Sequence, residues 1–493
     1  MTIADLLAHS EPVAYGEKKI PVKMGEREIF VISDLHMAAG LNNNGNFDGT
    51  ENFFADSSIS RFLLHLKQKA DAEKKALLII NGDFIDFLRI RNIPQDATDI
   101  DEWKSILTEL GITKTAAELE SSIIDKERTY GLRTDDYKSV WKLHVCWKGH
   151  REVFKCLAEF LREGNELLIV KGNHDLEWVW KPVRDSLRLI LAKEISAAGH
   201  TSTENALQFT VLPRISFVDD NLVIDEKIYI EHGHNYENFT VVEGPPILAT
   251  GTELNLPFGS FFNRYLINRI ELAYPYIDMV RPRKNVLALL IRERFPLALR
   301  MLGWYIPFMV RIIPKKKYAY ALRYLFQVLL IIGVPVIIFL FAIWQTYTHR
   351  PDVPPDTEKS TLIWKIVLPQ IKNFGFLALS YFLGRAFSMM QLSAPSSLYP
   401  NAQKIFGKNL QYRFITFGHT HDPEQKREGN QRFYNTGTWI PVYEMDAAAV
   451  RLDKTYTFLQ FTKNDSGEIQ AAGLMRWNDD ASRIDAMELR DSI

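Results

Sequence analysis

The chain has 493 residues, of which 46% are apolar and 24% are charged, and its net charge is −1. This composition is typical of a folded protein with a substantial core, and the charge balance argues against nucleic acid as a partner. The two cysteines, Cys146 and Cys156, exclude a disulfide framework and a CxxC metal site, and the N-terminus lacks the basic start and apolar run of an export signal.

Short β-branched runs that alternate with helical patterns predict an α/β fold. Five such runs end at polar clusters containing Asp, Asn or His, and they cover residues 28–33, 76–81, 166–171, 227–231 and 412–417. Three later runs, at 433–439, 456–462 and 471–477, predict antiparallel strands that close the domain. One domain is therefore expected to combine residues 1–244 with residues 410–493.

Two insertions interrupt this pattern. The first covers residues 90–163 and includes a predicted long helix from Tyr137 to Arg162, whose apolar residues fall on one face. The second covers residues 245–409 and differs in composition from the rest of the chain. Between Arg281 and Arg323 it carries eleven Lys or Arg and a single acidic residue, Glu293, interleaved with aromatic and aliphatic residues. This pattern predicts an element that contacts an anionic membrane, and the alternative is a solvated basic surface on a helical subdomain.

An uncharged stretch follows the basic segment. Residues 324–344 contain no charge and are long enough to span a bilayer, and Pro335 is tolerated in such helices. A weaker apolar stretch covers residues 362–383. Because the strand pattern resumes after residue 410, the chain must return to the side of the membrane that it left. Either the two stretches form a transmembrane hairpin, or the first stretch only dips into the membrane. The Lys and Arg residues before the first span predict that the domain formed by residues 1–244 and 410–493 lies on the cytoplasmic side of the cell membrane.

Polar clusters stand at the carboxyl ends of the five predicted strands, where an open α/β sheet binds ligands. Carboxylate and imidazole groups together suit Mn, Fe or Zn, and so many candidate ligands fit two divalent ions better than one. Two ions bridged by a carboxylate and a hydroxide create a nucleophile and neutralise a phosphoryl group. The clusters are Asp34 with His36, Asp83 with Asp86, Asn173 with His174 and Asp175, His232 with His234, and His419 with His421.

This ordered set of motifs resembles the calcineurin-like metallophosphoesterase family, and the resemblance covers residues 28–235 and 410–475. It implies a β-sandwich flanked by helices, here with a helical membrane-inserting insertion. It also implies that Asp34, His36 and His421 bind one metal ion, that Asp83 bridges, and that Asn173, His232 and His419 bind the other. The resemblance further implies that His174 acts as general acid or transition-state donor.

The other polar residues of the clusters receive supporting roles. Asp86 and Asp175 are expected to orient ligand histidines or to cap turns rather than to bind metal. His234 is expected either to support a ligand or to face the substrate.

The family resemblance implies phosphoester or pyrophosphate hydrolysis by attack of the metal-bridging hydroxide. The membrane insertion lies between the His232 and His419 clusters, which favours a phosphate on a lipid or lipid-linked substrate. The chain is similar to the UDP-2,3-diacylglucosamine pyrophosphohydrolases at residues 32–36, but departs from them at His174, where those enzymes usually carry Arg. Two alternatives remain: a soluble nucleotide or cyclic dinucleotide as substrate, and a non-catalytic membrane scaffold. The sequence does not predict the oligomeric state.

Overall fold

In the computed structural model, the described residues are 2–8, 10, 21–25, 27–69, 75–274, 280–281, 290, 293–294, 296–297, 300, 303–304, 397–444, 449–450 and 454–487. The chain divides into two compact units, one formed by residues 1–279 with 395–493 and the other by residues 280–394. The second unit is therefore smaller than the predicted insertion at 245–409, and it contains β8 (Val280–Arg281).

The first unit contains two mixed sheets. One sheet has the order β16 (Arg483–Ala486), β15 (Ile469–Asn478), β14 (Thr457–Lys463), β2 (Glu28–Ile32), β3 (Ala76–Asn81), β4 (Glu166–Val170) and β5 (Ile215–Val218). The other has the order β1 (Pro21–Val22), β6 (Asn221–Ile224), β7 (Ile228–Glu231), β9 (Phe414–Phe417), β11 (Gln431–Asn435) and β10 (Glu424–Glu428). A short antiparallel pair joins β12 (Tyr443–Glu444) to β13 (Ala449–Val450).

The two sheets pack face to face because their strands are apolar on the facing sides. One buried cluster contains Val31 and Ile79 from the first sheet together with Ile230 and Phe414 from the second. Successive residues of a strand point to opposite faces, so Phe30 and Ile80 belong instead to a cluster shared with the helices. The predicted α/β class is confirmed, with two packed sheets at its centre.

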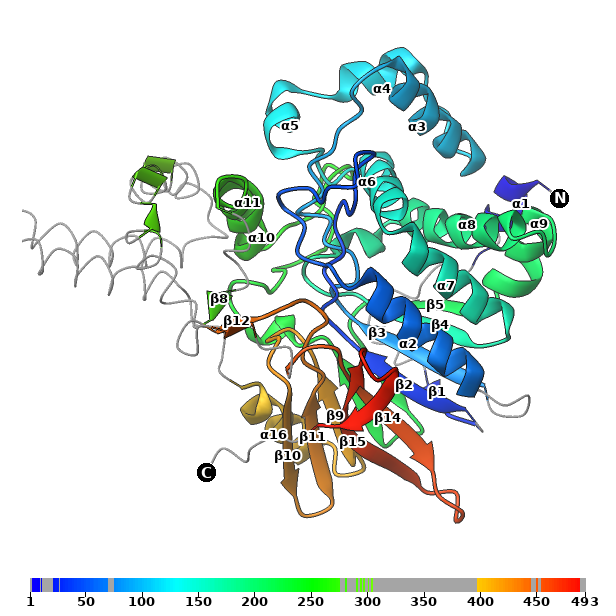
Figure 1. Cartoon of the computed structure of the whole chain (residues 1–493), viewed down its shortest axis with the longest axis vertical. Coiled ribbons are helices and arrows are strands. Elements are labelled where there is room, and N and C mark those ends of the chain that lie inside the picture. Colours follow the sequence, from blue (N-terminus) through cyan, green and yellow to red (C-terminus); the bar gives the residue numbers. More distant parts are fainter. Residues whose placement is uncertain are drawn as a thin grey trace, which may run out of the picture. The chain divides into compact units, whose positions relative to one another are not determined.

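Helices cover the outer faces of both sheets (Figure 1). Leu63 of α2, Phe154 of α7 and Leu187 of α8 pack on the first sheet, and Ala402 of α16 packs on the second. The helices are α1 (Ile3–Ala8), α2 (Asp56–Lys69), α3 (Ala97–Glu109), α4 (Ala116–Ser122), α5 (Asp125–Tyr130), α6 (Asp136–Gly149), α7 (Arg151–Arg162), α8 (Lys181–Ala197), α9 (Thr203–Asn205), α10 (Phe258–Phe262), α11 (Asn268–Glu271) and α16 (Tyr399–Lys408). The shorter helical turns are η1 (Leu176–Val179), η2 (Ala206–Val211), η3 (His234–Tyr236) and η4 (Asn263–Ile267).

The prediction of a single long helix from Tyr137 to Arg162 is wrong. The segment forms two helices, α6 and α7, which meet at His150. Gly149 lies so close to the loop after β2 that an added Cβ would come within 1.9 Å of the carbonyl oxygen of Ala39. His150 then turns between two acidic side chains, with Nδ1 2.7 Å from Asp56 Oδ1 and Nε2 3.1 Å from Glu51 Oε2. These tertiary contacts end the first helix.

The closing strands also differ in part from the prediction. β14 and β15 are antiparallel, as expected, but β11 runs parallel to β9 and pairs antiparallel only with β10. Among the described residues, no helix combines the length and the apolar character that crossing a membrane requires. The predicted spans at 324–344 and 362–383 lie outside these residues.

Candidate metal centre

The five predicted polar clusters lie in loops that begin where strands end. Three of the strands, β2, β3 and β4, are parallel neighbours in the first sheet, and the other two, β7 and β9, are parallel neighbours in the second. Parallel strands present their carboxyl ends at one edge of a sheet. Because the two sheets pack face to face, their edges bring all five loops to one place.

The first group of ligands consists of Asp34, His36 and His421. Nε2 of His421 lies 3.3 Å from Asp34 Oδ1 and 3.0 Å from Nε2 of His36. Residues 385 positions apart in the chain are therefore in contact, since His36 follows β2 and His421 follows β9. The three side chains are the ones expected to share one metal ion.

Asp83 lies at the centre of the cluster. Its Oδ2 is 3.1 Å from Nε2 of His232 and 3.6 Å from Nε2 of His36. Asp83, His232 and His419 form a second group of potential ligands, and His36, Asp83 and His174 form an overlapping one. Asp83 is buried, belongs to the second group and contacts His36 of the first group, as expected of a carboxylate that bridges two ions.

Asn173 contributes an amide oxygen to the same region. The side chain is buried, and its Oδ1 has no hydrogen-bond partner among the described residues, although its backbone oxygen accepts a hydrogen bond of 3.4 Å from Ser260 on α10. Oδ1 of Asp34 is likewise buried without a hydrogen bond in the described structure. Burying an uncompensated polar atom is costly. The imidazoles of His36 and His421 face the Asp34 oxygen, so the Asn173 oxygen is the one that requires an additional partner.

Asp86 supports two histidines at once. Its Oδ2 lies 3.1 Å from Nδ1 of His36 and 2.8 Å from Nδ1 of His174. The same oxygen lies 3.1 Å from Nε of Arg89. A carboxylate at one ring nitrogen fixes the orientation of a histidine and leaves the other nitrogen for chemistry. This is the orienting role that the sequence suggested for Asp86.

Asp175 caps the turn that carries Asn173 and His174. Its two oxygens accept hydrogen bonds of 2.6 Å from the Gly172 amide and 2.8 Å from the Phe84 amide. His234 is buried, with its ring centroid 5.5 Å from that of His232 and 6.5 Å from that of His419. It lies beside the second ligand group.

Glycine permits the closest approach between loops. Gly172 immediately precedes Asn173, and an added Cβ there would lie 2.1 Å from Asp83 Oδ1 and 2.6 Å from the Asp83 amide nitrogen. The loops after β3 and β4 could not remain in contact with any larger residue at this position.

Five of the clustered residues have backbone angles that L-residues seldom adopt. Asp34, His36, Asp83, His419 and His421 have φ values between 51° and 71°. Each such angle costs on the order of 1 kcal/mol or more, and strain of this kind concentrates at functional sites. The packing of the loops must compensate this cost.

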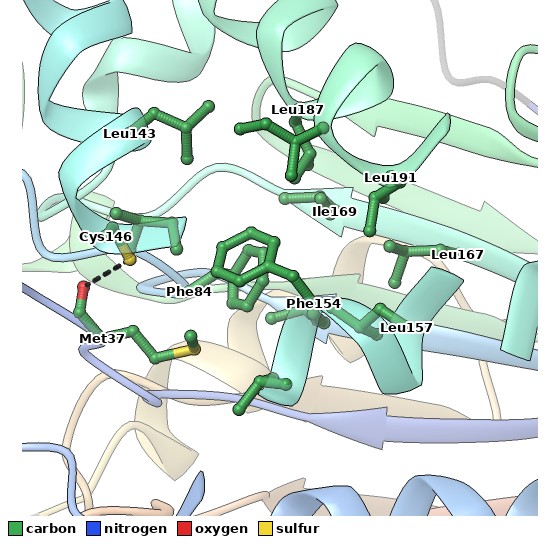
Figure 2. Packing of buried hydrophobic residues seen from close by; sticks show 14 of the residues in the cluster. Met37, Phe84, Leu143, Cys146, Phe154, Leu157, Leu167, Ile169, Leu187 and Leu191 are labelled. Atoms are coloured by element: carbon green, nitrogen blue, oxygen red, sulfur yellow. Dashed lines mark hydrogen bonds between the residues drawn. The ribbon is translucent and has the colours of Figure 1, made fainter. Parts of the chain in front are cut away.

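The buried core beneath the site supplies that compensation (Figure 2). Met37 follows His36 and Phe84 follows Asp83, and both are fully buried against helices α6, α7 and α8. The Met37 amide donates to the Phe84 carbonyl at 3.1 Å, and the His36 amide donates to the Asp83 carbonyl at 2.9 Å. In these two loops, the residue after the candidate ligand therefore anchors the loop in the core.

The carboxyl groups and the imidazoles of the site shift one another's pKa values. Burial alone would raise the pKa of Asp34 and Asp83, but neighbouring histidines lower the pKa of both carboxyls well below their usual range. Burial likewise opposes protonation of His36, yet Asp34 and Asp86 raise its pKa to about 10, and Asp83 and Asp34 raise the pKa of His232 to about 9. Without a metal ion, protons balance the carboxylates, so metal binding must release protons.

The residues present fit two divalent cations. They offer carboxylate oxygens, an amide oxygen and imidazole nitrogens, which is the mixture preferred by Mn, Fe or Zn. The uncompensated amide oxygen of Asn173 and the strained backbones of the candidate ligands point to the same conclusion. Chemically, such a site can polarise a phosphoryl group and activate water.

Sequence reasoning did not identify Arg89 or Glu271. Arg89 pairs with Asp86 and also with the carboxylate of Glu271 on α11, and all three side chains are buried. Arg89 follows Asp86 by three residues, but Glu271 lies 182 residues further along the chain. A charged residue within the apolar loop after β3 was the only sequence signal.

No protein-family model and no curated protein matches this chain at a significant level.

Proposed function

We propose that this protein is a calcineurin-like, binuclear metal-dependent phosphoesterase that acts at a membrane from its cytoplasmic side. The observation that carries the proposal is the convergence of six of the seven candidate ligands, from the loops after β2, β3, β7 and β9, on one cluster, with the buried side chain of Asn173 in the loop after β4. A protein that used this fold only as a scaffold would have no chemical need for the strained backbone of five of its clustered residues.

In this proposal Asp34, His36 and His421 hold one ion, while Asn173, His232 and His419 hold the other. Asp83 serves both, which is consistent with its contacts to His36 and His232. The ions, when bound, would supply Lewis-acid activation of water and of the phosphate. The protein contributes the fixed positions of the ligands, because a hydrogen bond or the core holds each loop.

In this proposal His174 donates the proton to the leaving group. Its side chain is 16% exposed, whereas the carboxylate that holds it is fully buried. Asp86 faces Nδ1 of His174, so the ring is oriented and its second nitrogen is available. A donor at this position would neutralise the oxygen that leaves when the phosphate bond breaks.

The composition of the insertion supports a lipid phosphate as substrate. Residues 281–323 are basic and aromatic, and residues 324–344 are uncharged and apolar. These segments lie between the His232 and His419 clusters in the chain. An active site tethered at an anionic bilayer would meet phosphorylated headgroups at high local concentration.

Incubation of extracted native membranes with the purified protein and Mn²⁺ tests this proposal, with lipids followed by mass spectrometry. The matched control is Asp83→Ala, which removes the carboxylate proposed to bridge the two ions. Loss of a phospholipid or lipid-linked nucleotide only with the unmutated protein would support the proposal and name the bond. If no lipid changes while a soluble diester is hydrolysed, the lipid assignment is wrong and the segment serves as an anchor.

A further inference from the structure

Two ligand histidines of the site share one arrangement of their rings. In His36, Nδ1 faces Asp86 at 3.1 Å and Nε2 faces the ligand cluster, 3.6 Å from Asp83 Oδ2. In His232, Nδ1 lies 2.8 Å from the carbonyl oxygen of Asn81, and Nε2 lies 3.1 Å from Asp83 Oδ2. One nitrogen is thus held by an acceptor of the protein, which fixes the tautomer, and the other is presented to a metal ion.

His419 has a corresponding partner on a different loop. Its Nε2 lies 3.5 Å from Oε1 of Glu237, and its backbone amide donates to Asp34 Oδ2 at 3.0 Å. Since Nε2 faces a carboxylate, Nδ1 is the nitrogen that remains for the group formed with Asp83 and His232. His419 would then use the opposite ring nitrogen from His36 and His232.

Glu237 is held in position to serve this role. It follows η3, and its backbone oxygen accepts hydrogen bonds from the amides of Thr240 and Val241 at 3.2 and 3.0 Å. Its Oε1 is buried and takes no hydrogen bond within the described structure. A buried carboxylate oxygen is unfavourable unless a donor or a positive charge faces it, and the imidazole of His419 is such a group.

We infer that Glu237 is a positioning residue of the metal centre, whose carboxylate accepts the Nε2 proton of His419 and directs Nδ1 to the second ion. This inference rests on the proposed binuclear function and adds a residue to it that lies outside the five strand-end clusters. A carboxylate in this position also fixes the ring orientation in which Nδ1 faces the ion. Loss of this carboxylate should therefore weaken the binding of one metal ion and leave the other ion bound.

Calorimetric titration of the metal-free protein with Mn²⁺ tests the inference. Glu237→Met keeps the approximate length of the side chain but has no strong acceptor, whereas Glu237→Gln keeps an oxygen that can accept the Nε2 proton. We expect the Met variant to lose roughly 10–100-fold in affinity for one of two ions, as is typical when such partners are removed, with a smaller loss for the Gln variant. Glu243→Met, an exposed acid six residues later in the same segment, is the matched control and should bind as the wild type does.

Thermal unfolding of the metal-free variants shows whether they are folded, and Glu237→Ala replaces the Met variant if the latter is not. Two ions bound with wild-type affinity by the Met or Ala variant would overturn this inference and leave the proposed function standing. A wild-type protein that binds no Mn²⁺ would overturn the proposed function and this inference together.

Discussion

Nδ1 of His174 lies 2.8 Å from Oδ2 of Asp86, and the same oxygen lies 3.1 Å from Nδ1 of His36. One buried carboxylate thus orients a candidate metal ligand and the candidate proton donor together. Any change at Asp86 should therefore affect metal binding and proton transfer at the same time.

We expect Asp86→Asn to lower kcat/KM for a model diester such as bis(p-nitrophenyl) phosphate by roughly 10–100-fold, the usual effect of removing a partner of this kind. The amide accepts hydrogen bonds less strongly than the carboxylate, so it fixes the tautomers of both rings less well. Steady-state rates at saturating Mn²⁺ measure the effect. Asp479→Asn is the control, since Asp479 pairs with Arg61 on the surface. Equal rates in the two variants would show that Asp86 does not orient the site.

Gly172→Ala should displace Asp83, because the new Cβ would lie 2.1 Å from its Oδ1. Overpacking of a well-packed region costs about 1–3 kcal/mol, and here the cost falls on the central carboxylate. Urea unfolding and Mn²⁺ titration should both show a loss. Gly407→Ala is the matched control, because an added Cβ in helix α16 meets no atom within 4 Å. A Gly172→Ala protein that binds Mn²⁺ as the wild type does would contradict the close contact between these loops.

The stability of the fold should depend on pH through His150. Burial lowers the pKa of this histidine, but Glu51 and Asp56 raise it to about 9. The raised pKa means that the charged form stabilises the folded state fully below the unfolded pKa of about 6.5, and that this contribution is lost as the pH rises toward 9. Each pKa unit corresponds to about 1.4 kcal/mol, so the contribution is on the order of 3 kcal/mol.

Urea unfolding of the wild type and of His150→Gln at several pH values measures this contribution. The difference in unfolding free energy between the two proteins should be largest near pH 6 and should shrink toward pH 9. Comparison at each pH removes the effects of the other titrating groups, which the two proteins share. A difference that stays constant with pH would mean that folding does not raise the pKa of His150.

The buried pair of Arg89 and Glu271 should be sensitive to removal of one partner. Glu271→Met leaves a buried guanidinium with less compensation, and breaking such pairs costs about 3–5 kcal/mol. Replacing both residues by Met removes the uncompensated charge, so the double variant should be more stable than the sum of the single effects predicts. Chemical unfolding of the four proteins measures this coupling. Additive effects would show that the pair contributes no net interaction.

The sequence was informative where local pattern and chemistry coincide. The strands that carry the ligands are short and β-branched, and the structure contains β2, β3, β4, β7 and β9 at the predicted positions within two residues. β10 was not predicted, because its residues Glu424–Glu428 are all polar and its position at the sheet edge leaves little to bury. Periodicity detects a strand only when one of its faces is covered.

Sequence patterns did not predict the long-range contacts. The break between α6 and α7 depends on the contact of Gly149 with Ala39, and on acidic partners of His150 that lie about 100 residues earlier. The roles inferred for Glu237 and Arg89 depend on partners 182 residues away in the chain. Neither residue belongs to a local motif, so only the folded structure brings them to the site.

Asp83 provides the most direct test of the account, because it belongs to the second ligand group and contacts His36 of the first. The measurement is Mn²⁺ binding by the metal-free wild type and by Asp83→Ala, with hydrolysis of bis(p-nitrophenyl) phosphate recorded on the same samples. The account predicts two ions per wild-type chain, and in the variant weakened binding of both ions with no detectable turnover. A wild-type chain that binds no Mn²⁺, or an Asp83→Ala protein with undiminished turnover, would contradict it.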